Sequence, residues 1–324
     1  QTWPSQGFGT EPPAPAPLLE PVVTYRLVLP PDCDPQLLLP KLRLLEEEDP
    51  QLHLDWDAEN REIHARLMGQ VQIEVLKQLI AERFQVEVAV DAGRILYKET
   101  IAAPVEGVGH FEPLRHYAEV HLLLEPLPQG SGVRLDTRCP EDVLDRNWQR
   151  LILTHLAEKT HRGVLTGAPL TDVKLTLMSG RAHLKHTEGG DFREATCRAI
   201  RNALMQAENV LLEPVVRFEL AMPNEALARV TGELLRIGAQ LDASETDGGE
   251  TTLTGRCTAA MFWDYPTRFA ASTHGHGRIA SRFDRYEPCK NQDDIVRQIG
   301  YDPLADTLNP PGSVFCSHGA GFYV

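Results

Sequence analysis

Several signals for catalysis and for membrane insertion are absent from this sequence of 324 residues. No GxxxxGK[ST] motif occurs, and no GxGxxG follows an expected strand, so no loop is available to cradle the phosphates of a hydrolysed nucleotide. The GxSxG and HExxH patterns of serine hydrolases and zinc proteases are missing too. Because no run of about 18 apolar residues is present, no transmembrane span is expected. We therefore predict that this chain is not an enzyme and does not enter a membrane.

Positive charge is also scarce. The chain has 32 Lys and Arg against 46 Asp and Glu, which gives a formal net charge of −14. Non-specific binding to nucleic acid needs a basic surface, so this function class is excluded, whereas a small local contact with RNA is not. The apolar share of 42% and the charged share of 24% are ordinary for a globular protein.

Cysteine and histidine spacing gives little support for a metal site. The six cysteines are far apart and form no CxxC pair, so we expect reduced thiols. His183 with His186, and His274 with His276, have no cysteine or carboxylate nearby at ligand spacing. We predict no metal and no cofactor in this chain, and a metal-dependent enzyme built on one of these pairs is kept as an alternative.

Hydrophobic periodicity divides the chain into α+β domains. After a Pro-rich linker over 1–21, residues 22–92 show the order strand, helix, strand, strand, helix, strand, and the same order recurs over 215–288. This order is typical of the ferredoxin-like fold. Residues 93–214 have a different α+β pattern, and residues 289–324 are a tail rich in Asp, Pro and Gly. We predict two ferredoxin-like domains flanking a third, distinct domain.

The expected elements end at prolines or at glycine-containing turns. Strands are expected over 24–29, 52–56, 62–68, 86–90, 116–124, 173–178, 215–220, 241–245, 251–256 and 278–286. Helices are expected between Asp34, as the N-cap, and Pro50, and over 71–80, 140–159, 192–207, 225–238 and 262–271.

The most unusual local stretch is 179–201. We expect a long polar loop after the strand that ends at Met178, then Gly189 and Gly190, whose freedom at positive φ would allow a sharp reversal. Asp191 stands where it would cap the following helix.

That helix carries three arginines on one side, at about 100° per residue: Arg193, Arg198 and Arg201. One interpretation is a polar fingertip whose arginine face meets phosphate. The simpler alternative is a solvated loop and the polar face of an ordinary amphipathic helix, since nearby carboxylates cancel much of the charge.

Several segments together resemble the elongation factor G family of ribosome-bound GTPases. The run TDVKLTLMSGRAHLKHTEGGDFREATCRAIRNAL (171–204), followed by VLLEPVVRFELAMP (210–223), resembles the junction of domains IV and V, where LLEP (211–214) is interpreted as the close of a helix. MGQVQIEVLKQLIAERFQVEV (68–88) resembles domain III, and LYKETI (96–101) resembles the opening of domain IV.

Two other segments, HYAEVHLLLEPLPQGSGV (116–133) and the tail SVFCSHGAGF (313–322), are more similar to the ribosomal protection tetracycline-resistance branch of that family. The resemblance implies domains III, IV and V, with a ribosomal protein S5 domain 2-like fold in the middle. It implies a parent GTPase that binds GTP and Mg in a preceding domain, and a chain that is monomeric, cytoplasmic and partnered with the ribosome.

The resemblance also implies site residues. The tip of domain IV would reach the decoding centre of the small subunit, where drug is displaced, through a main loop of Arg181, Ala182, His183, Leu184, Lys185, His186, Thr187, Glu188, Gly189 and Gly190. A second loop would contribute Pro113, Leu114, Arg115 and His116. Arg236 and Arg278 would lie near the factor-binding region of the large subunit.

Two alternatives remain open within this interpretation. The tip reads LKHTEGG, without the proline pattern of the tetracycline-resistance branch and without the acidic tip of elongation factor G. The parent is therefore alternatively a paralogue that acts in translocation or ribosome recovery. The other alternative is a stand-alone RNA-binding protein.

Overall fold

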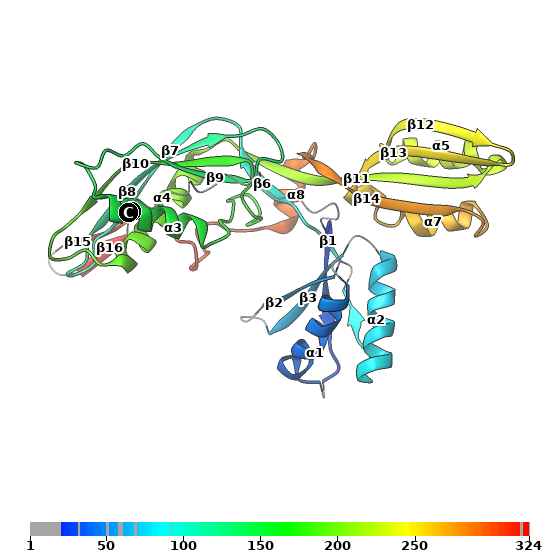
Figure 1. Cartoon of the computed structure of the whole chain (residues 1–324), viewed down its shortest axis with the longest axis horizontal. Helices are drawn as coiled ribbons and strands as arrows, with labels where there is room; N and C mark the ends of the chain where they lie inside the picture. The colour runs from blue at the N-terminus through cyan, green and yellow to red at the C-terminus, as the bar shows by residue number, and fades with distance from the viewer. Residues whose placement is uncertain are drawn as a thin grey trace, which may run out of the picture. The chain divides into compact units, whose positions relative to one another are not determined.

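The computed structural model describes residues 21–31, 33–49, 52–57, 61–67, 70–91, 93–317 and 320–323. They form three β-sheets with helices packed on them (Figure 1), which confirms the α+β class. The chain divides into two compact units, one from Gln1–Ile95 with Val215–Asp284 and one from Leu96–Pro214 with Arg285–Val324. The predicted five-part division of the chain stays a prediction. No helix within the described residues has the length and apolar character to cross a membrane.

The first sheet has the ferredoxin-like strand order β2-β3-β1-β4, with β5 also paired to β1. Its elements are β1 (Val23–Val28), α1 (Pro35–Glu48), β2 (His53–Asp57), β3 (Glu62–Leu67), α2 (Gln70–Phe84), β4 (Ala89–Val90) and β5 (Arg94–Ile95). Asp34 caps α1 as predicted and accepts the Gln36 N–H at 2.9 Å. The last predicted strand, 86–90, is shortened to its final two residues. Residues 58–60, between the expected strands 52–56 and 62–68, lie outside the described residues.

The second ferredoxin-like sheet has the order β12-β13-β11-β14. Its elements are β11 (Asn209–Pro223), η1 (Asn224–Ala226), α5 (Leu227–Arg236), β12 (Gln240–Asp247), β13 (Glu250–Thr258), α6 (Ala259–Phe262), α7 (Tyr265–Ser272) and β14 (Arg278–Pro288). The predicted helix over 262–271 is in fact two, because Pro266 lacks an N–H and is accommodated in the first turn of a new helix.

The interpretation of LLEP as the close of a helix is wrong. Residues 211–214 lie inside β11, since Asn209–Leu212 pair antiparallel with β6 (Lys98–Ile101). Strand pairing satisfies their backbone groups where no helix continues.

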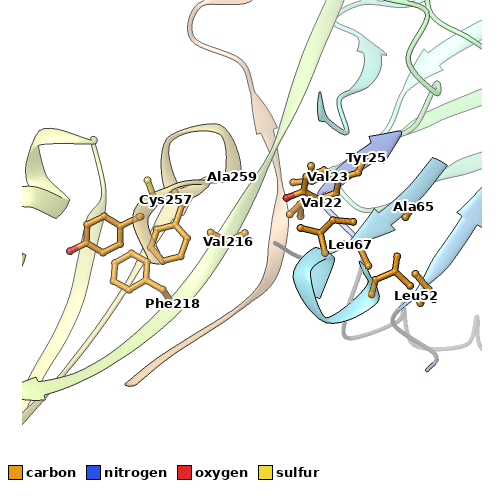
Figure 2. Packing of buried hydrophobic residues seen from close by; sticks show 14 of the residues in the cluster. Val22, Val23, Tyr25, Leu52, Ala65, Leu67, Val216, Phe218, Cys257 and Ala259 are labelled. Atoms are coloured by element: carbon orange, nitrogen blue, oxygen red, sulfur yellow. The ribbon is translucent and has the colours of Figure 1, made fainter. Parts of the chain in front are cut away.

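Strand β1 buries alternate side chains, as a period of two predicts, whereas β11 buries every residue from Leu211 to Val216. The buried residues of β1 are Val23, Tyr25 and Leu27, and Figure 2 shows Val23 and Tyr25 together with Val216 and Phe218 of β11. The Phe218 ring stacks on Phe262 with centroids 5.1 Å apart.

The second unit contains a six-stranded sheet in the order β16-β15-β7-β8-β10-β9. Its strands are β7 (Val105–Phe111), β8 (Ala118–Pro126), β9 (Val133–Thr137), β10 (Val173–Ala182), β15 (Val314–Ser317) and β16 (Ala320–Tyr323). Its helices are α3 (Arg146–Ala157), α4 (Gly189–Gln206) and α8 (Gln292–Ile299). Strands β6, β7, β9, β15 and β16 and helix α8 were not predicted. Helix α3 is shorter than the predicted 140–159, because Asp145 caps it and accepts the Asn147 N–H at 2.8 Å.

Helix α4 lies directly against β7. A Cβ on Gly109 would overlap the carbonyl oxygen of Ala195, and one on Gly107 would overlap that of Ala199. Glycine is therefore required for this close approach, which sets where α4 begins relative to the end of the sheet.

Candidate functional site

Two loops meet at one end of the six-stranded sheet: 112–117, between β7 and β8, and 183–188, between β10 and α4. Strands β8 and β10 are antiparallel with Ala118 opposite Ala182, so both loops leave the sheet together. The Tyr117 N–H donates to the His186 carbonyl oxygen at 3.0 Å, and the Thr187 hydroxyl donates to the Tyr117 carbonyl oxygen at 2.6 Å. We call 112–117 and 183–188 the tip. The structure brings together the two loops that the family resemblance implied to be neighbours.

The 183–188 loop is closed by its own hydrogen bonds. The His183 N–H donates to the Thr187 hydroxyl oxygen at 2.6 Å, and the Thr187 N–H donates back to the His183 carbonyl oxygen at 3.1 Å. The rings of His183 and His186 stack with centroids 4.6 Å apart. This turn leaves Lys185 exposed and Leu184 fully exposed at its outer edge.

The start of α4 differs from the prediction. Glu188 is the N-cap, and Asp191 is the third residue of the helix rather than its cap. Gly189 and Gly190 are the first helical residues and have no positive φ, so the predicted glycine reversal is wrong. The reversal is made by the closed turn before them.

Asp191 makes a connection between the two loops that the sequence did not predict. Its side chain is buried, Oδ2 accepts the Glu188 N–H at 2.8 Å, and Oδ1 lies 2.9 Å from His116 Nδ1. One carboxylate thus joins the start of α4 to the second loop. The E-x-x-D spacing at 188–191 forms a capping box and could have indicated the bond between Asp191 and the Glu188 N–H, but not the contact with His116.

Arg181 lies in β10 rather than in the predicted loop, opposite Glu119 of β8. Burial raises the pKa of Tyr117, the Glu119 charge adds to that shift, and a hydrogen bond with Arg181 opposes it. Burial disfavours ionisation of Glu119, yet hydrogen bonds from His121 at 2.7 Å and Tyr117 at 3.2 Å hold its pKa below the ordinary value. A charged, hydrogen-bonded carboxylate therefore lies behind the tip.

The three arginines of α4 do not form one exposed face, which both interpretations of this helix had assumed. Arg198 is buried, pairs with Glu194, and lies 5.3 Å from the centroid of the Phe111 ring. Arg193 is exposed but donates to Glu158 at 2.9 Å.

Arg201 is 3% exposed. Its guanidinium donates to the carbonyl oxygen of Gly163 at 3.0 Å, the hydroxyl of Tyr301 at 2.6 Å and the carbonyl oxygen of Pro303 at 3.1 Å. Residues from distant parts of the sequence cover this side of α4, which helical spacing alone does not reveal.

The tip carries two exposed cations. Within the described part of the chain, the side chains of Arg115 and Lys185 form no ion pair, and both are exposed. Leu114 is 61% exposed beside them. The tip can donate hydrogen bonds to phosphate or base edges and can make apolar contacts, because ammonium and guanidinium groups are donors.

Comparison with known families agrees with this geometry. Residues 93–208 match the family described as elongation factor G, domain IV, and residues 210–295 match the elongation factor G C-terminus. Two successive stretches of the chain are therefore similar to domains of elongation factor G. The family prediction is confirmed at this level, and the tetracycline-resistance branch stays a prediction.

A solved structure matches over a longer range. It is the crystal structure of a protein from Thermus thermophilus, with 26% identity and a TM-score of 0.69. The match covers 88% of this chain and 44% of that one, so this chain spans less than half the length of that protein.

The remaining predicted contact residues, Arg236 and Arg278, lie in the segment that matches the elongation factor G C-terminus. Arg236 is the last residue of α5 and is exposed. Arg278 begins β14, with a 76% exposed side chain that is 2.9 Å from Glu250. Within the described ranges, the structure shows no hydrogen bond or ion pair that connects Arg236 with Arg278.

A group of side chains that could hold a metal ion lies outside the tip and outside both histidine pairs. Within the described ranges, the cluster whose ligand atoms lie close enough for one ion is Asp57, Glu62 and His64, and neither predicted His pair belongs to it. Glu62 is already paired with Arg26 at 2.9 Å. The His-pair alternative therefore gains no support from the described residues.

Proposed function

We propose that this chain is the ribosome-contacting C-terminal part of a translational GTPase, and that the tip of domain IV contacts small-subunit RNA at the decoding centre. The observation that supports this is the tip, where two loops are joined by hydrogen bonds and present the side chains of Arg115 and Lys185 without an ion pair. In this proposal GTP and Mg²⁺ are bound by a preceding domain of the parent, and the chain itself is non-catalytic.

The physical account agrees with an acidic protein. Structured RNA is recognised largely by shape, through donors to phosphates, 2′-hydroxyls and base edges. A site with a few donors makes few phosphate contacts, so its affinity depends only weakly on salt. Other negative charges, far from the tip, are screened over about 10 Å at 0.1 M salt.

The test is ribosome binding by a double variant, Arg115→Ala with Lys185→Ala, of the full-length parent. Each lost phosphate contact lowers the slope of log affinity against log salt by about 1, so we expect a slope smaller by about 2. The matched control removes the same charge from α1 by Lys41→Ala with Arg43→Ala, both exposed. Equal affinities and slopes for the two double variants would refute the proposed contact.

We further propose that the parent belongs to the ribosomal protection branch and displaces tetracycline, with Arg236 and Arg278 near the large subunit. The support is the resemblance of 116–133 and 313–322 to that branch. Tetracycline resistance would be measured in a susceptible host that expresses the intact gene. Resistance that disappears in the tip double variant supports this role. Ribosome binding without resistance would favour the alternative, a paralogue in translocation or ribosome recovery, which the LKHTEGG tip also allows.

A further inference from the structure

We propose that the C-terminal hairpin β15–β16 braces the tip, and that Phe315 and His110 are positioning residues for the loops that contact RNA. The contact with RNA rests on the proposed function above. The brace itself consists of contacts within the free protein.

The hairpin covers the edge of β7. Strand β15 pairs parallel with β7 at Val314 and Phe111. The Glu112 N–H donates to the Val314 carbonyl oxygen at 2.8 Å, and the His110 N–H donates to the Ser313 hydroxyl oxygen at 3.0 Å. In the order β16-β15-β7-β8, β7 would be an edge strand without the hairpin, and these N–H groups would lose their partners.

The ring of Phe315 packs against the last residues of β7. It stacks on His110 with centroids 4.3 Å apart and planes at 17°. The His110 side chain is 11% exposed, with Nε2 2.9 Å from Glu112 and Nδ1 3.4 Å from Glu119. His110 is thus held on its face by the hairpin and on both ring nitrogens by carboxylates.

His110 in turn contacts Tyr117 of the tip. Its ring meets Tyr117 edge to face at 5.2 Å, and the Tyr117 hydroxyl donates to Glu119 at 3.2 Å. The backbone of Tyr117 makes the two hydrogen bonds to His186 and Thr187 that join the loops. A contiguous path therefore runs from Phe315 through His110 and Tyr117 to the 183–188 loop.

The other support of the tip is independent of the hairpin. Asp191 holds His116 from the start of α4. Loss of the brace should therefore loosen Tyr117 and the 183–188 loop while α4 stays protected, which separates positioning from general unfolding.

The test is amide hydrogen exchange in the whole chain with Phe315→Ala. We expect the amides of Tyr117 and His183 to exchange about 3- to 10-fold faster, the size expected for one lost aromatic pair. Phe315→Tyr keeps the ring face and should restore the wild-type rates. Cys316→Ala, the next residue of β15, is the matched control and should leave the tip unchanged.

Phe315→Leu is the second variant, in case Phe315→Ala does not fold. It keeps apolar volume without a ring face and should still speed exchange at the tip. Unchanged tip exchange in a folded Leu or Ala variant overturns the proposal, as does equal acceleration throughout β8, β10 and α4. Tip exchange that responds as expected while no form of the protein binds ribosomes would contradict the proposed function and leave the brace supported.

Discussion

Replacing Asp191 by alanine tests whether one carboxylate joins the two loops of the tip. The change removes the acceptor for the Glu188 N–H and the partner of His116 Nδ1, at 2.8 and 2.9 Å. Loss of a helix-capping interaction costs about 1 kcal/mol, and loss of a hydrogen bond to a partly exposed group costs about 1 kcal/mol. The sum of about 2 kcal/mol corresponds to about a 30-fold increase in local opening, at tenfold per 1.4 kcal/mol.

Hydrogen exchange resolves where this opening occurs. We expect faster exchange over the first turn of α4 and over residues 116–117. Asp145→Ala is a suitable control, because Asp145 caps α3 by a single 2.8 Å bond to the Asn147 N–H and should open only that helix, by about 1 kcal/mol. If Asp191→Ala opens α4 alone, with 116–117 unchanged, the carboxylate does not join the loops.

Three further predictions follow from packing and titration. Gly109→Ala should destabilise the second unit by about 2 kcal/mol, because the added Cβ would overlap Ala195. The control, Gly190→Ala, places its Cβ in open space and should change the melting temperature little. Similar melting temperatures for the two variants would contradict the close approach of α4 and β7. Arg201→Ala should cost about 3 kcal/mol and speed proteolysis over 300–309, since the guanidinium holds Tyr301 and Pro303; an unchanged cleavage rate would contradict this. Burial lowers the pKa of His161 below its ordinary 6.5, although a hydrogen bond to Leu156 opposes the shift. As the pH falls, His161 is protonated in the unfolded chain before it is protonated in the folded protein. The contribution of neutral, buried His161 to folding stability is therefore present above pH 6.5 and is lost as the pH falls through the folded pKa. Between about pH 7.5 and 5.5, the melting temperature of His161→Gln should decrease less than that of the wild type.

Local elements of the candidate site were predictable only in part. The neighbouring loops followed from the resemblance, and strand β8 and helix α4 from periodicity. The burial of Arg198 and Arg201 was not predictable, because the groups that cover them are Phe111 and the segment around Tyr301, far away in sequence. The reversal before α4 depended on a hydrogen bond between Thr187 and His183, which no composition rule indicates.

Amphipathic periodicity and turn residues by themselves determined the two ferredoxin-like patterns and the Asp34 cap, and composition determined the net charge of −14. These depend on local spacing, which a sequence displays directly. Only the tertiary structure decided that 211–214 is a strand, that β15 pairs with β7, and that Asp191 meets His116. Each depends on a partner far along the chain, and hydrogen-bond pairing and burial are decided by which segments meet in space.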